Sequence, residues 1–124
     1  MRRDDLDTID GQLGVTMPAE YRLLELRPPA DLHASDCTRW IFDTAGQVVS
    51  ATQQYRVQGI GEKPFPPDYV VIGETGTGDF FCLDLSQNPA PVVEFDHERH
   101  RFRVVSFSFT SWPKRLSRQS EGAT

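Results

Sequence analysis

The chain has 124 residues, of which 38% are hydrophobic and 25% charged, and its net charge is −5. This length fits one globular domain that needs neither a metal nor a disulfide to complete its core. The acidic balance argues against a nucleic-acid-binding protein, because contacts with phosphates need a basic surface.

Features of the chain's start and its cysteines favour the cytoplasm. Cys37 and Cys82 are the only cysteines, too few for the disulfide framework of a small secreted domain. Residues 1–3 are followed at once by an acidic stretch, so the apolar part of a signal peptide is missing. No apolar run has the length of a membrane span. We therefore expect a cytoplasmic protein without membrane contacts, and the sequence leaves its oligomeric state open.

Two helices are predicted within residues 4–26. Apolar side chains recur at helical spacing from Leu6 to Leu13, behind acids that suit a first helical turn. Gly14 can end this helix, and Pro18 suits the start of the second.

The remainder of the chain predicts strands separated by turns. β-Branched and aromatic residues gather in segments 37–42, 47–49, 69–72, 79–85, 92–95 and 102–105. Ser50 could cap a short helix that runs through Arg56, and residues 108–116 predict a closing helix that contains Pro113. The predicted fold class is α+β. A central, mostly antiparallel sheet of about five or six strands carries the N-terminal helices and a short C-terminal helix on one face, and the other face is open to a partner.

The glycine-rich run at residues 73–78 joins two strands of this sheet. It lacks the Lys-Ser/Thr ending of a phosphate loop, and a strand follows it where a nucleotide-binding motif needs a helix. A turn between strands is the better interpretation. Gly73 and Gly78 are expected to serve this turn, and Asp79 is expected to bind its backbone N–H groups.

No catalytic or metal site follows from the spacing of reactive residues. Asp79 and Asp84 lie on opposite faces of a predicted strand, which makes them a poor acid/base pair. Cys82 lies among apolar residues, as is typical of a buried, unreactive thiol. We expect no catalytic residues, no metal and no cofactor. The potential metal ligands, which lack a recognised spacing, are His33, Cys37, Cys82, His97 and His100.

Acidic residues gather around the ends of the central strands. Such a group is usually only a solvated surface, but it would also contact a basic protein and steer its approach. The predicted partner-binding residues are Glu74, Asp79, Asp84, Glu94, Asp96 and Glu98.

Three motifs, in this order, resemble the SUKH superfamily. They are Leu13-Gly14-Val15-Thr16-Met17-Pro18-Ala19-Glu20-Tyr21, the segment 71–84 with Gly73, Gly78 and Asp79 at its turn, and the closing segment 108–116. Departures from the family's pattern occur at residues 27–29 and at Pro113. The resemblance implies an α+β domain with a central antiparallel sheet in residues 1–118, followed by a flexible tail at 119–124. It implies a structural role for the turn residues and no active site.

The resemblance also implies a function. Many bacterial members look like immunity proteins that neutralise a polymorphic toxin, frequently a nuclease or deaminase delivered by contact-dependent inhibition or type VI secretion. We therefore expect an immunity protein whose partner is a cognate toxin, with a basic toxin fitting the acidic residues. The alternative is a regulatory or scaffold binding module, as in fungal relatives that act in cell-wall synthesis. A small enzyme would instead need a pocket lined by His97, His100 or Cys82.

Overall fold

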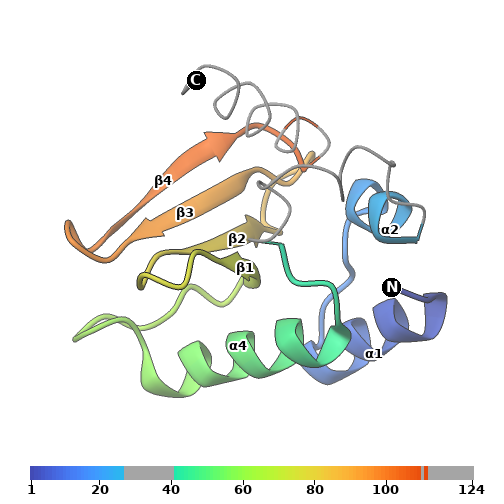
Figure 1. Cartoon of the computed structure of the whole chain (residues 1–124), viewed down its shortest axis with the longest axis horizontal. Helices are drawn as coiled ribbons and strands as arrows, with labels where there is room; N and C mark the ends of the chain where they lie inside the picture. Colours follow the sequence, from blue (N-terminus) through green and yellow to red (C-terminus); the bar gives the residue numbers. More distant parts are fainter. Residues whose placement is uncertain (27–40, 110, 112–124) are drawn as a thin grey trace.

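The computed structural model describes residues 1–26, 41–109 and 111. In these residues, three helices precede a four-stranded antiparallel sheet, so the predicted α+β class is confirmed (Figure 1). The sheet has the order β1-β2-β3-β4, and each strand pairs with the next along the chain. The elements are α1 (Arg3–Leu13), α2 (Ala19–Leu26), α4 (Ala45–Gln58), β1 (Tyr69–Glu74), β2 (Phe80–Asp84), β3 (Val92–Asp96) and β4 (Arg101–Ser106).

Helices α1 and α2 form in the region that the sequence predicted. At the start of α1, the backbone N–H of Arg2 donates to the Asp5 carboxylate at 2.8 Å. Gly14 ends the helix with a φ of 67°, a left-handed conformation that glycine adopts without a steric penalty. The apolar residues at helical spacing, Leu6, Ile9 and Leu13, are buried.

The predicted strand at residues 47–49 is wrong, because this segment lies inside α4. Thr44 begins the helix: its hydroxyl accepts from the Gln47 N–H at 3.2 Å, and its own N–H donates to the Gln47 side chain at 3.3 Å. This capping box begins the helix well ahead of Ser50, the predicted cap. The described residues therefore form four strands rather than five or six.

Helix α4 is tied to the first strand by a buried hydrogen bond. The hydroxyl of Thr52 accepts from the backbone N–H of Val71 at 2.9 Å. At this point the pairing of β1 with β2 shifts register between Val71 and Gly73. Ile41 forms an isolated bridge with Gly73, so the end of the predicted strand 37–42 lies beside β1, and its other residues lie outside the described part.

Aromatic rings in contact with one another join α4 to three strands. The ring of Tyr55 in α4 lies 4.2 Å from that of Phe80 in β2, measured between centroids. Phe80 lies 5.0 Å from Phe95 in β3, and Phe95 lies 5.2 Å from Phe102 in β4. Because these phenylalanines pair across neighbouring strands, they form one continuous apolar row on the helix-covered face.

The sheet is also buried on its second face at β2. All five residues of this strand are buried, although successive side chains point to opposite faces. The expectation of an open second face is therefore wrong for β2. Tyr21 of α2 and Phe109 belong to the same core, with ring centroids 4.9 Å apart. Residues 110 and 112–116 of the predicted closing helix, and the predicted tail at 119–124, lie outside the described residues.

Candidate partner-binding surface

The turns between β1 and β2 and between β3 and β4 lie at the same end of the sheet (Figure 1). This placement follows from the antiparallel register, which sets Glu74 beside Phe80 and Phe80 beside Phe95. Most of the predicted partner-binding acids therefore come together. We call this region the hairpin-tip surface, and it consists of Glu74, Thr75, Thr77, Asp79, Glu94, Asp96, His97, Glu98, Arg99 and Arg103.

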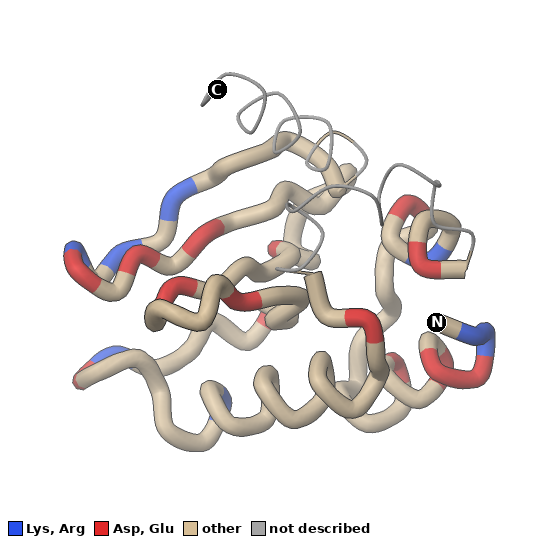
Figure 2. Tube along the Cα trace, in the orientation of Figure 1, with Lys and Arg blue, Asp and Glu red and all other residues tan. Residues whose placement is uncertain are grey.

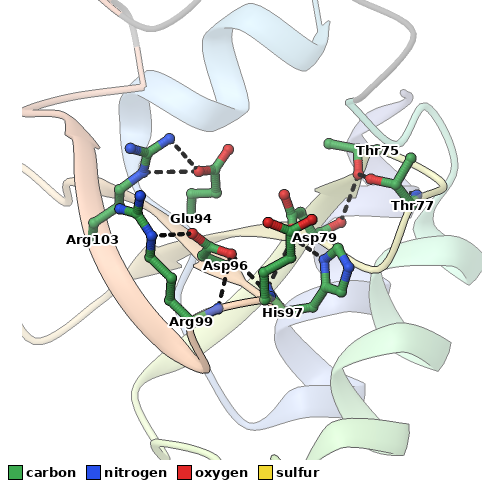
Figure 3. A network of polar contacts seen from close by, with 9 residues as sticks. Thr75, Thr77, Asp79, Glu94, Asp96, His97, Arg99 and Arg103 are labelled. Atoms are coloured by element: carbon green, nitrogen blue, oxygen red, sulfur yellow. Dashed lines mark hydrogen bonds and ion pairs between the residues drawn. The ribbon is translucent and has the colours of Figure 1, made fainter.

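The two turns are joined by Asp79 and His97 (Figure 3). One Asp79 carboxylate oxygen accepts from the His97 backbone N–H at 2.9 Å and lies 2.5 Å from Nδ1 of the imidazole. The backbone and side-chain hydrogen bonds from His97 lower the pKa of Asp79. The side-chain bond raises the pKa of His97, so the contact favours a charged pair.

Asp79 binds its own turn through its backbone carbonyl. It is the Asp79 backbone carbonyl that accepts from the Thr75 N–H, at 3.1 Å, and from the Thr75 hydroxyl, at 3.3 Å. The carboxylate is thereby left to hold the neighbouring turn at His97.

Two glycines allow this turn to close against His97. Gly76 and Gly78 have φ values of 83° and 107°, in the region that other residues rarely adopt. A Cβ at Gly78 would lie 3.0 Å from Cγ of His97, so the imidazole packs directly on the glycine backbone. Gly73 lies within β1 at its register shift rather than in the turn itself.

Arginines neutralise part of the acidic surface. Glu94 accepts from Nε of Arg103 at 2.9 Å and lies 2.7 Å from its Nη2. Asp96 accepts from the backbone N–H of Glu98 at 3.0 Å, and Nε of Arg99 lies 3.9 Å from its other oxygen. The hairpin-tip surface is therefore mixed in charge. These arginines are not among the residues predicted from the sequence, although strand pairing places Arg103 opposite Glu94.

Glu74 and Glu98 are the exposed acids of this surface that remain without an ion pair among the described residues. Their carboxylates are the ones most available to a cation on a partner.

Asp84 lies at the opposite end of β2 and is buried. Its carboxylate accepts from the Ser86 N–H at 3.0 Å, the Ser86 hydroxyl at 2.5 Å and the Gln87 amide at 2.9 Å. Burial acts to raise the pKa of Asp84, but these hydrogen bonds outweigh it and the pKa is lowered. Asp84 orders the turn after β2, so we leave it out of the proposed contact surface.

The possible metal ligands are already engaged in hydrogen bonds. Asp79, Asp96 and His97 offer donor atoms within 4.8 Å of one another. An ion at this place would have to displace the Asp79–His97 bond, so the geometry is that of a hydrogen-bonded network. Cys82 is fully buried, and burial raises the pKa of its thiol well above the usual value, in agreement with the predicted unreactive thiol. His33 and Cys37 lie outside the described residues.

Within the described residues, no helix has both the length and the apolar character that a membrane span requires.

Comparison with known proteins places the chain in a family. A comparison with curated protein sequences returned no match. A family model for the SMI1/KNR4 family (SUKH-1) matches residues 2–115, a range that contains every helix and strand described above. The chain therefore belongs to the SMI1/KNR4 family, SUKH-1.

Proposed function

We propose that this chain is an immunity protein that neutralises a cognate bacterial toxin by binding it directly. The observation that carries this proposal is the family match over residues 2–115, because many bacterial members of the SUKH superfamily look like immunity proteins. The proposed mechanism needs no catalytic group in this chain. It needs a complementary surface that blocks the toxin's active site or holds the toxin in an inactive conformation.

The hairpin-tip surface suits such contacts because hydrogen bonds hold its two turns together before a partner arrives. The Asp79–His97 pair joins the turns, and the Thr75 bonds to the Asp79 carbonyl close the first of them. A preorganised surface loses little conformational entropy on binding. The surface would form part of an interface of about 1,600 Å² in total.

The charges of this surface favour a basic partner. Glu74 and Glu98 are exposed and lack an ion pair among the described residues, so they can accept cations from the toxin. Glu94 and Asp96 are only 14% and 21% exposed, whereas their partners Arg103 and Arg99 are 59% and 64% exposed. Glu74 and Glu98 are therefore the acids that we expect to contact the toxin first.

Co-expression with the product of the adjacent open reading frame tests this proposal. We expect the neighbour to stop growth when expressed alone, and this chain to restore growth and to co-purify with the neighbour. A harmless neighbour that does not co-purify would overturn the immunity proposal and favour the regulatory or scaffold module.

A charge-reversal variant tests the surface separately. Glu74→Lys combined with Glu98→Lys should weaken rescue, because both changes place cations against a basic partner. Asp68→Lys is the matched control: Asp68 is also exposed, but it precedes β1 at the opposite end of the sheet. Full rescue by the double variant would agree with an immunity function but would show that the hairpin-tip surface lies outside the interface.

A further inference from the structure

The outward side of α4 is free of charge. The helix has 14 residues, no acid, and Arg56 as its only basic residue. We define the α4 outer face as the exposed, uncharged residues Gly46, Gln47, Ser50, Gln53, Gln54, Val57 and Gln58. With 3.6 residues per turn, they lie on the side of the helix opposite the buried Ala45, Val48 and Thr52. Figure 2 shows the uncharged length of α4, interrupted by a single basic position.

The one cation of α4 is directed towards α1. Nη1 of Arg56 donates to the backbone carbonyl of Leu13 at 2.9 Å, which places the guanidinium at the end of α1. The last turn of α1 carries Gly11 and Gln12, which are also exposed and uncharged, but the exposed acid Asp7 lies one turn earlier on the same helix.

Such a surface is unusual on this protein. Charged residues make up 25% of the chain, and solvent-facing sides of helices normally carry them. Val57 lies in this face with 86% of its surface exposed. Depletion of charged residues is one compositional feature of the centre of a protein–protein interface.

We propose that the α4 outer face is a self-association surface, at which α4 of one copy packs against α4 of a second copy around a twofold axis. Two copies of a chain with a net charge of −5 repel each other, and an uncharged face allows approach with the least repulsion. Glutamine amides both donate and accept hydrogen bonds, so Gln53, Gln54 and Gln58 can pair with the same residues of the second copy. A twofold interface requires this self-complementarity.

The length of α4 limits the size of the contact. A helix of 14 residues is about 21 Å long, and one side of it offers less area than the roughly 800 Å² that a standard interface buries on each partner. The α4 outer face would therefore form the centre of the contact and not all of it. A reversible dimer is expected rather than an obligate one.

Sedimentation equilibrium of the purified full chain tests the proposal. The wild type should associate to a dimer with rising concentration. Val57→Glu and Gln54→Glu place like charges opposite each other across the twofold axis and should weaken the dimer about tenfold or more. Val104→Glu is the matched control, because Val104 is also an exposed valine, at 53%, but lies on β4. Circular dichroism would establish that each variant is folded.

Three results would overturn the proposal. They are a wild type that stays monomeric at the highest soluble concentration, a dimer that Val57→Glu and Gln54→Glu leave unchanged, and a dimer that Val104→Glu weakens equally. A monomeric wild type whose toxin neutralisation is abolished by Val57→Glu would assign the face to the toxin instead of a second copy.

Discussion

Glu25 is a buried acid on α2, and its environment favours the protonated carboxyl group. Burial is the largest cause and raises its pKa to about 7. The N-terminal ammonium group acts in the opposite direction, while Asp43 adds to the increase. The folded protein therefore holds a proton at Glu25 in a pH range where the unfolded chain has released it.

Glu25→Gln should change how stability depends on pH. In the wild type, the free energy of unfolding should fall by about 1–3 kcal/mol as the pH rises from 4.5 to about 7, because the native state binds the extra proton. Glutamine cannot ionise, so the variant should lose this part of the dependence and be more stable than the wild type at pH 8. Urea unfolding at several pH values measures the effect, with Glu20→Gln as a control for charge removal on the same helix. If the free energy of unfolding of Glu25→Gln depends on pH as strongly as that of the wild type, the dependence does not come from Glu25.

The pair of Asp79 and His97 predicts a shifted histidine titration. The hydrogen bond raises the pKa of His97, so its contribution to stability is complete below the ordinary histidine pKa and is lost as the pH rises through the raised one. Asp79→Asn should move the pKa of His97 back towards its ordinary value, because the main cause of the shift is removed. An NMR titration of the His97 imidazole in both proteins measures this. Equal pKa values would show that the bond is not formed in solution.

At the scale of elements, one hydroxyl connects α4 to the sheet. Thr52→Val keeps the shape of the side chain but leaves the buried N–H of Val71 without its acceptor. We expect a loss of about 1–3 kcal/mol in the free energy of unfolding, the cost of an unsatisfied buried donor. Thr52→Ser retains the hydroxyl and should lose less. The expectation fails if urea unfolding gives equal stabilities for Thr52→Val and Thr52→Ser.

The glycine turn allows a comparison of two similar positions. Gly76→Ala meets no atom within 4 Å and should cost about 1–2 kcal/mol, for its positive φ alone. Gly78→Ala adds a Cβ that would lie 3.0 Å from the His97 ring, so it should cost more. Removing the ring with His97→Ala should recover part of the difference, as a double-mutant cycle would measure. Equal losses for both glycines would exclude the packing of His97 on Gly78.

Patterns that depend on adjacent residues predicted much of the fold. The segments 69–72, 79–85, 92–95 and 102–105 correspond to β1, β2, β3 and β4, and helical spacing identified α1 and α2. The strand predicted at residues 47–49 depended on Val48 and Val49, but β-branched residues favour strands only when no stronger local signal opposes them. The capping box of Thr44 with Gln47 supplied that signal.

The contacts at the candidate site that could not be predicted join residues far apart in the sequence. Asp79 and His97 are 18 positions apart and meet only because β2 and β3 pair in one register. Strand pairing likewise brings Arg103 to Glu94. The sequence therefore predicted which acids lie near the turns, but not which of them are neutralised. Asp84 was predicted to contact a partner but is buried, because its carboxylate binds the turn that follows it.

At the scale of the whole molecule, charge is unevenly distributed over the described residues (Figure 2). The hairpin-tip surface carries acids with arginine partners, and α4 carries a long uncharged face. These two regions suit different contacts, the first with a basic toxin and the second with another copy of the chain.

The proposed immunity role requires that this SUKH-1 protein binds a toxin directly. Isothermal titration calorimetry between the purified chain and the purified product of the adjacent open reading frame tests it most directly. We predict saturable binding in the nanomolar range, which corresponds to about −12 kcal/mol, and weaker binding by the Glu74→Lys/Glu98→Lys variant. If the neighbour is toxic on its own but shows no detectable binding, the proposed neutralisation by direct binding is wrong.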